Sequence, residues 1–416
     1  MAKTSVMVVD DSALMRNLIS KIFQQTDDLE VCGTAMNGRF ALDKLHRLKP
    51  DVIVLDLEMP DVNGIDFLTE CRKRGVHIPV IILSSHAQRG ARITMDALSL
   101  GAEDFILKPT GRGGPDVQSV AEQLVGMARA YGGEYRAKRE RGEVSDIPGP
   151  SRGERAGGGA AAPPREEKHG EERPGEAARE EAAKEEAAAT GQPEIAAPKL
   201  RGRTGDPARG LPSLTPERKP GAIKAIAIGI STGGPNALRR MLPGLSPDVN
   251  VPILIVQHMP AGFTKEFARS LDRLCTQEVR EAAEGDILTP GRIFIAPGDR
   301  HMRVERKSLA TIVRISEDAL ISGHRPSADA LFASVAETFG HECLAIIMTG
   351  MGRDGAREIG TIYEAGGMTA GQDEKSCVVY GMPRAAREAG YLHEQVALDD
   401  MADFINATAM ELQESS

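Results

Sequence analysis

The chain has 416 residues, 41% of them hydrophobic and 27% charged, and carries a formal net charge of −9. No apolar stretch approaches the roughly 18 residues that a membrane span needs, so we expect no direct membrane insertion. The acidic balance argues against nucleic acid as a partner, because DNA-binding domains usually carry a basic patch. Five scattered cysteines without a Cys-x-x-Cys pair favour neither a disulfide framework nor a zinc cluster. These features, with no secretory signal pattern at the N-terminus, predict a cytoplasmic protein.

Five short apolar runs in the first 130 residues predict the strands of a parallel sheet. Amphipathic helical patterns lie between them, for example at 13–23 and 40–48. This alternation is typical of a (βα)5 doubly wound domain. The predicted strands are residues 5–9, 30–34, 52–55, 80–83 and 104–107.

Charged and hydroxyl side chains follow four of these strands. Asp10 and Asp11 follow the first strand, Asp56 the third, Ser84 the fourth and Lys108 the fifth. The carboxyl ends of such strands meet at one edge, and three converging carboxylates favour a bound divalent cation such as Mg²⁺. The set predicts an acyl-phosphate site in which Asp56 is the nucleophile, Lys108 balances charge and Ser84 contacts phosphoryl oxygens. Capping of the first helix is the alternative for the first two aspartates.

Residues 1–125 resemble a response-regulator receiver. The resemblance implies a (βα)5 receiver fold and phosphorylation by a partner histidine kinase. It rests on Val-Val-Asp-Asp-Ser-Ala-Leu-Met-Arg at 8–16, Asp56, Met-Pro-Asp-Val-Asn-Gly at 59–64, Ser84 and Lys108-Pro109.

The receiver resemblance also implies individual roles. Asp56 would accept the phosphoryl group. Mg²⁺ would be held by Asp11, Asp56 and the Glu58 backbone carbonyl, with Asp10 acting nearby. Phe105 matches the switch aromatic of the family, which repacks together with the serine after the fourth strand.

The middle of the chain, residues 131–221, has the composition of a linker. It consists mainly of Gly, Ala, Pro, Glu and Arg, and no aromatic residue lies between Tyr135 and Phe263. Such a segment cannot bury enough apolar surface to offset its conformational entropy. We therefore expect a long disordered tether between a domain at 1–130 and a second domain at 222–412.

The second domain opens with an apolar run at 222–230 that leads into Ser231 and a glycine pair, followed by a helical pattern at 236–242. Three interpretations of Ser231 are open from this local pattern. The loop could cradle a phosphate, the serine could be a nucleophile beside an oxyanion site, or it could only cap the helix. The lack of a Walker lysine disfavours the phosphate cradle.

A histidine and an aspartate follow two further predicted strands. His258 comes directly after the strand at 251–256, and Asp354 follows the strand at 342–349. A histidine at the end of an adjacent parallel strand could take the proton from Ser231, and the aspartate could orient its ring. Asp354 could instead be only a turn residue, because it precedes a glycine. The chain order Ser, His, Asp differs from that of α/β-hydrolases.

Residues 222–412 are similar to the catalytic domain of chemotaxis protein-glutamate methylesterases of the CheB type. With the receiver, this implies an α/β protein whose C-terminal hydrolytic domain is doubly wound and mostly parallel. The matching blocks, in chain order, are 228–235, 257–263, 296–302, 325–329, 349–355 and 380–386.

This second resemblance implies the parts of an esterase site. Ser231 would be the nucleophile, His258 the general base and then acid, and Asp354 the residue that orients the ring. The Met351 backbone N–H would donate to the oxyanion, and Thr232 would support the histidine. Of the other histidines, we expect His301 in a loop near the cleft and His324, His341 and His393 at ordinary surface or loop positions.

The expected reaction is hydrolysis of glutamate methyl esters on methyl-accepting chemoreceptors, with release of methanol and no cofactor for the esterase step. The family also includes deamidation of receptor glutamines. The resemblance also implies that the unphosphorylated receiver covers the catalytic cleft and inhibits the esterase. The long linker departs from the family and lowers the effective concentration of the receiver at this cleft. Inhibition by the receiver is therefore either weaker here or supported by a stronger interface.

Alternatives to this function are a serine hydrolase for another ester and a non-enzymatic binding module. A DNA-binding regulator is the least favoured.

Overall fold

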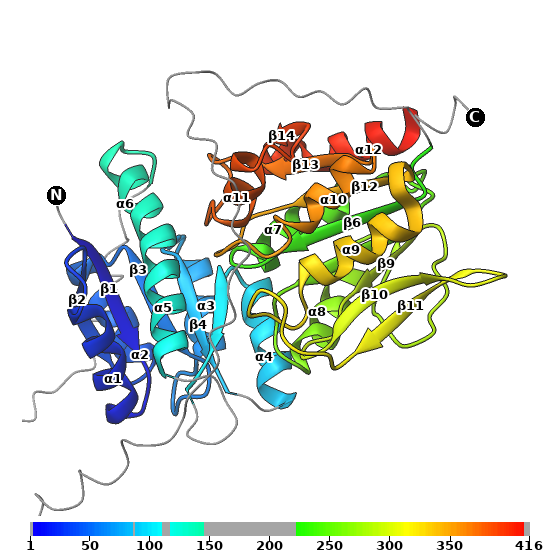
Figure 1. Ribbon diagram of the computed structural model, residues 1–416. Helices are drawn as coiled ribbons and strands as arrows, with labels where there is room; N and C mark the ends of the chain where they lie inside the picture. The colour runs from blue at the N-terminus through cyan, green and yellow to red at the C-terminus, as the bar shows by residue number, and fades with distance from the viewer. Residues whose placement is uncertain (1–2, 86–87, 110–116, 145–221, 412–416) are drawn as a thin grey trace, which may run out of the picture. The chain divides into compact units, whose positions relative to one another are not determined.

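The computed structural model describes residues 3–85, 88–109, 117–144 and 222–411 (Figure 1). The described parts of 1–150 and 214–416 belong to one compact unit. Most of the expected linker, residues 145–221, lies outside the described ranges. No helix in those ranges combines the length and the apolar character needed to cross a membrane.

The N-terminal domain contains a fully parallel five-stranded sheet with the strand order β2-β1-β3-β4-β5. Strands β3, β4 and β5 are buried at every residue, as expected for a sheet covered on both faces. This confirms the expected (βα)5 fold. The strands are β1 (Thr4–Val9), β2 (Leu29–Ala35), β3 (Val52–Asp56), β4 (Val80–Ser84) and β5 (Asp104–Leu107).

Five helices connect or follow these strands (Figure 1). Side chains cap three of them: Ser12, Asn37 and Asn63 each accept a hydrogen bond from a backbone N–H of the first turn. The loops before these helices are thereby fixed beyond the carboxyl ends of the strands. The helices are α1 (Ala13–Gln24), α2 (Gly38–Leu48), α3 (Gly64–Lys73), α4 (Gln88–Ser99) and α5 (Val117–Met127).

The last helix of this domain continues past the boundary expected at residue 130. A π-helical turn at Ala128–Gly132 leads into α6 (Gly133–Glu140). The cause is burial, because Tyr131 and Tyr135 are only 4% and 6% exposed. The first ten residues assigned to the linker are therefore helical and pack on the N-terminal domain.

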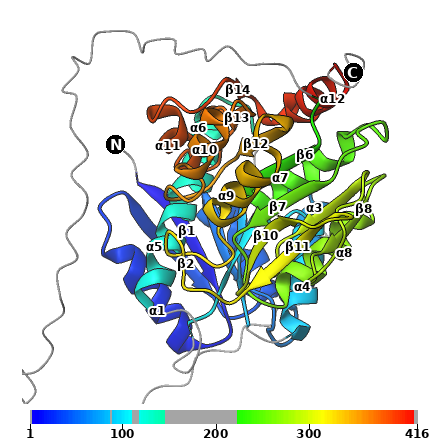
Figure 2. The ribbon, with the colours of Figure 1, turned by 45° about the vertical axis from the view of Figure 1, so that its right-hand side comes forward.

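The C-terminal domain contains a parallel seven-stranded sheet with the order β14-β13-β12-β6-β7-β9-β8. This agrees with the expected doubly wound, mostly parallel domain. An antiparallel hairpin of β10 (His301–Arg306) and β11 (Thr311–Ser316) forms a separate two-stranded sheet (Figure 2). The strands of the large sheet are β6 (Ala225–Ile230), β7 (Ile253–Gln257), β8 (Glu278–Glu281), β9 (Arg292–Ile295), β12 (Cys343–Ile347), β13 (Met368–Gln372) and β14 (Glu394–Val396).

Helices again join the strands of this sheet. They are α7 (Gly234–Met241), α8 (Phe263–Asp272), α9 (Ala328–Phe339), α10 (Glu358–Glu364), α11 (Met382–Glu388) and α12 (Met401–Glu411), with short 3₁₀ turns at Leu242–Gly244, Gly340–Glu342 and Leu398–Asp400.

The two faces of the central strand β6 differ in side-chain size. Its isoleucines belong to one hydrophobic cluster and its alanines to another, as the two-residue period of a strand requires. On the alanine face, a Cβ atom at Gly229 would lie 2.7 Å from the Cβ of Ala328. This close approach brings the N-terminus of α9 directly onto the sheet, beside the loops that follow β6 and β12.

Candidate active site

The serine and the histidine singled out in the sequence follow two adjacent strands. Ser231 comes directly after β6 and His258 directly after β7. The strands are parallel and pair Ile230 with Gln257, so the two following residues leave the sheet side by side. Asp354 lies in the loop after β12, which pairs with β6 on its other side. The parallel topology therefore gathers all three residues at one sheet edge.

The ring of His258 lies between the other two side chains. Its Nδ1 atom is 3.1 Å from the Ser231 Oγ, and its Nε2 atom is 2.8 Å from Oδ2 of Asp354. The His258 side chain is 9% exposed and that of Asp354 is fully buried. Donation from Nε2 to the carboxylate leaves the Nδ1 lone pair facing the serine hydroxyl, so the ring can act as its base.

Asp354 is held by the N-terminus of α9. It accepts hydrogen bonds from the hydroxyl of Ser327 at 2.6 Å and from the N–H groups of Ala328 and Asp329 at 2.6 and 3.3 Å. Burial alone would raise the pKa of Asp354, but the hydrogen bond and charge of His258 and these donors outweigh it and lower the pKa. The carboxylate is therefore ionised and fixed in direction.

The loop after β12 also holds the serine loop. The Ser231 N–H donates to the Thr349 carbonyl at 2.9 Å, and the Thr349 hydroxyl donates to the Thr232 carbonyl at 2.9 Å. The Thr349 N–H in turn donates to Oε1 of Gln372. Within the described residues, Thr232 contributes through its carbonyl, and no hydrogen bond joins its side chain to His258.

The backbone after Thr349 passes very close to the serine. A Cβ atom at Gly350 would lie 2.8 Å from the Cβ of Ser231, and the Gly350 carbonyl accepts from the N–H groups of Gly381 and Met382. The next residue, Met351, has a 43% exposed side chain. Its N–H donates to no acceptor in the described part of the chain, so it is available beside the serine, as an oxyanion donor must be.

Sequence reasoning missed a second ring at this site. His324 stacks on His258, with centroids 3.9 Å apart and planes 10° from parallel. Burial, and secondarily the charge of His258, lowers the pKa of His324 to about 4, so it is a neutral stacking partner at neutral pH. No periodicity in its loop signals this contact. The expectation for His301 was also wrong: it is a fully buried residue of β10, and its Nε2 lies 3.0 Å from the Ala319 carbonyl.

The N-terminal domain carries an acidic cluster at its own sheet edge. Asp10, Asp11 and Asp56 each offer a carboxylate oxygen, and these atoms lie within 4.8 Å of one another. The Lys108 Nζ lies 2.9 Å from Asp10 and 2.7 Å from Asp56. Burial would lower the pKa of Lys108, but these two carboxylates outweigh it and raise the pKa. An all-oxygen donor set of this kind fits Mg²⁺.

The two predicted switch residues of this domain make contacts outside the acidic cluster. The Ser84 hydroxyl is 2.7 Å from the Thr94 hydroxyl on α4. The Phe105 ring stacks on Phe263, at the start of α8, with centroids 4.9 Å apart and planes 11° from parallel. Strand β5, which is followed directly by Lys108 of the acidic cluster, thus also contacts the C-terminal domain.

The start of β5 contacts the helix after Ser231. Oδ2 of Asp104 accepts a hydrogen bond from the Gly233 N–H at 2.8 Å, and Glu103 accepts one from the Asn236 side chain at 2.7 Å. Burial, partly offset by its hydrogen bonds, raises the pKa of Asp104 to about 6.

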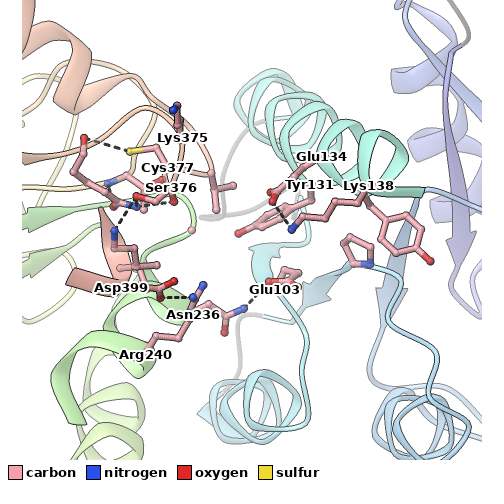
Figure 3. A pocket seen from close by; sticks show the side chains of 18 of the residues that line it. Glu103, Tyr131, Glu134, Lys138, Asn236, Arg240, Lys375, Ser376, Cys377 and Asp399 are labelled. Atoms are coloured by element: carbon pink, nitrogen blue, oxygen red, sulfur yellow. Dashed lines mark hydrogen bonds and ion pairs between the residues drawn. The ribbon is translucent and has the colours of Figure 1, made fainter. Parts of the chain in front are cut away.

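A cavity of about 770 Å³ adjoins this contact (Figure 3). Glu103, Tyr131 and Lys138 line it from the N-terminal domain, and Asn236 and Cys377 line it from the other. The serine, histidine and aspartate of the site above are not part of its lining. The cavity is therefore distinct from that site.

Comparisons with known proteins identify both domains. The family model described as CheB methylesterase matches residues 226–405, and that of the response regulator receiver domain matches residues 6–114. A protein-glutamate methylesterase/protein-glutamine glutaminase of Treponema denticola is 47% identical over 412 residues, which cover 96% of this chain and 97% of that protein. The chain belongs to the CheB methylesterase family. The resemblance that the sequence motifs indicated is thereby confirmed.

Other relatives agree with this assignment. The protein of the same description in Treponema pallidum is 47% identical over 415 residues, covering 97% of this chain and 96% of the relative. The crystal structure of the Thermotoga maritima CheB methylesterase catalytic domain is 34% identical and covers 44% of this chain and 98% of its own, with a TM-score of 0.44. The match to the Treponema pallidum protein spans both domains of this chain.

Proposed function

We propose that Ser231, His258 and Asp354 form the catalytic triad of a protein-glutamate methylesterase that also acts as a protein-glutamine glutaminase. The observation that carries this proposal is the His258 ring, which is hydrogen-bonded to the serine hydroxyl on one side and to a buried, ionised carboxylate on the other. Such an arrangement makes a weakly nucleophilic hydroxyl reactive.

The geometry supports a two-stage hydrolysis. Nδ1 of His258 takes the Ser231 proton as Oγ attacks the ester carbonyl, and the Met351 N–H donates to the resulting oxyanion. The protonated ring then gives this proton to the departing methoxy group, so methanol leaves and an acyl-serine remains. Water attacks that ester, His258 takes the water's proton and returns it to Oγ, and a free glutamate carboxylate is released.

The same residues support deamidation. With a glutamine side chain as substrate, the group that leaves in the first stage is ammonia instead of methanol, and the second stage is unchanged. The substrates are glutamate methyl esters and glutamines on the cytoplasmic part of methyl-accepting chemoreceptors, so the chain acts in the cytoplasm.

The receiver domain supplies the control. Asp56 accepts a phosphoryl group from a histidine kinase, with Lys108 beside it to balance the added charge. Asp11, Asp56 and the Glu58 carbonyl would hold Mg²⁺, with Asp10 nearby. When bound, the ion offsets negative charge between the carboxylates and the phosphoryl oxygens.

Strand β5 offers a route from the phosphorylation site to the esterase. Its residues contact the catalytic domain through the Phe105–Phe263 stack and the Asp104–Gly233 hydrogen bond. Phosphorylation of Asp56 repacks Ser84 and Phe105 and shifts the receiver from a docked to an undocked arrangement, which changes access to the triad and leaves its chemistry unaltered.

The test is product release by the full chain acting on a methylated receptor fragment. Ser231→Ala should lose both methanol and ammonia release while Asp56 still becomes phosphorylated. Ser246→Ala is the matched control, because within the described residues that hydroxyl bonds to the nearby Asp248 alone. Methanol release at the wild-type rate in the Ser231→Ala variant would remove this serine from the mechanism.

A further inference from the structure

A buried glutamine joins the serine loop to the histidine loop. Gln257, the last residue of β7, is 2% exposed. Its side-chain Nε2 donates to the Ser231 carbonyl at 3.0 Å and to the His258 carbonyl at 3.2 Å. One NH₂ group thus spans the backbones of the proposed nucleophile and the proposed base.

The direction of this carboxamide follows from its surroundings. Two carbonyl oxygens require a donor, and only the NH₂ end of a glutamine side chain can supply two N–H groups. The other end, Oε1, is buried and receives no hydrogen bond from any described residue. If the amide were reversed, Oε1 would face the carbonyl oxygens of Ser231 and His258, which would repel it. The observed direction is therefore the favourable one.

The site is built around the unpartnered oxygen. A Cβ atom at Gly234, the first residue of α7, would lie 1.9 Å from Oε1 of Gln257. Only glycine therefore leaves room for the carboxamide at this position. The start of α7 therefore encloses this end of the carboxamide.

We infer that Gln257 is a positioning residue for the reaction, which fixes the distance between the Ser231 hydroxyl and the His258 ring by tying their backbones together. The inference rests on the proposed function, because it presupposes that Ser231 is the nucleophile and His258 its base. It assigns no chemistry to Gln257 itself. No described hydrogen bond links Gln257 to the serine hydroxyl or the imidazole, so it acts through their main chains. A small displacement between a nucleophile and its base is enough to reduce the rate strongly.

The test uses Gln257→Glu in the full chain. This variant keeps the size and shape of the side chain, but an ionised carboxylate cannot donate to the two carbonyl oxygens. We expect kcat for methanol release to fall about 10- to 100-fold at pH 8 with KM nearly unchanged. A protonated carboxyl regains one donor, and burial raises the pKa of such a group, so the loss should be smaller at pH 6.

Gln277→Glu is the matched control. Gln277 is also buried, at 6% exposed, and its Nε2 donates to the Ser246 carbonyl at 2.8 Å, away from the triad. It should lower the melting temperature by a similar amount and leave kcat and its pH profile unchanged. Equal kcat losses in the two variants would mean a general effect on folding and would overturn the inference.

Gly234→Ala is a second variant, for use if Gln257→Glu does not fold. It disturbs the link between the serine and histidine loops without adding charge. Its methyl group must push the carboxamide aside, and we expect a comparable fall in kcat. A wild-type kcat in either folded variant would overturn the positioning role. Wild-type activity in Ser231→Ala would instead overturn the proposed function, so the two failures are distinguishable.

Discussion

At the scale of single residues, the environment of His258 sets the chemistry. Its two ring nitrogens contact Ser231 and Asp354, and its face is covered by His324. The carboxylate selects the tautomer, and the stacked ring limits rotation. The sequence motifs alone indicated Ser231, His258 and Asp354, because each lies in the loop that follows a predicted strand. They could not indicate His324, which reaches the site through a loop without any periodic pattern.

Replacing Asp354 with Asn should lower kcat by about 10²- to 10⁴-fold. The Asn NH₂ group would face Nε2 of His258, and this would favour the tautomer whose proton points at Ser231. KM should change little, because the carboxylate is buried away from substrate. The measurement is the steady-state rate of methanol release, and a loss of less than about threefold would contradict the role of the carboxylate.

His324 should make the protein less stable in mild acid. Its pKa is depressed to about 4 by burial, so the unfolded chain binds a proton at higher pH than the folded chain does. Stability from this residue is present above pH 6.5 and is lost as pH falls toward 4. We expect His324→Phe to reduce this acid-induced decrease in the free energy of unfolding by up to about 2 kcal/mol. The figure is kept below the full pKa shift because the ring is only partly buried.

Urea unfolding of the full chain at pH 7 and pH 4.5 measures the effect. Phe keeps the stack on His258 but does not titrate, so the variant should show the shallower decrease between the two pH values. His341→Phe, in the 3₁₀ turn before β12 and so at the other end of that strand from Asp354, serves as the comparison. An identical pH dependence in wild type and His324→Phe would disprove the assignment.

At the scale of secondary-structure elements, β5 is the strand that connects the two proposed sites. Its residues Asp104 and Phe105 contact the catalytic domain, and the lysine just beyond it contacts Asp56. The sequence predicted this strand with the bounds that the structure has, because an apolar run ends at a lysine. The partners of Asp104 and Phe105 in the catalytic domain were not predictable, because each lies more than 100 residues further along the chain.

Asp104→Ala should weaken the contact between β5 and the serine loop. It removes the acceptor for the Gly233 N–H and leaves that group without its described partner. We expect basal methanol release to rise about two- to tenfold and the stimulation by phosphorylation to shrink by the same factor. Asp66→Ala, on the partly exposed first turn of α3, is the control. A basal rate no higher than that of wild type would argue against a restraining contact.

At the scale of the whole molecule, the sequence predicted two α/β domains, and the structure confirms that each contains a parallel sheet. Strand runs, acidic strand ends and glycine-rich turns are local signals, and this is why they could be read directly. The helix that continues to Glu140 was missed because its support is tertiary: Tyr131 and Tyr135 are buried against the N-terminal domain. Gln257 was missed for the same reason, since a buried amide between two loops leaves no pattern in sequence.

The most direct measurement for the whole account is the initial rate of methanol release by the full chain on a methylated receptor fragment, with and without a small-molecule phosphodonor and Mg²⁺. We expect the phosphodonor to raise the wild-type rate, Asp56→Asn to stay at the basal rate, and Ser231→Ala to release no methanol in either condition. A wild-type rate that is the same with and without phosphorylation would rule out control by the receiver, and methanol release by Ser231→Ala would rule out the serine as nucleophile.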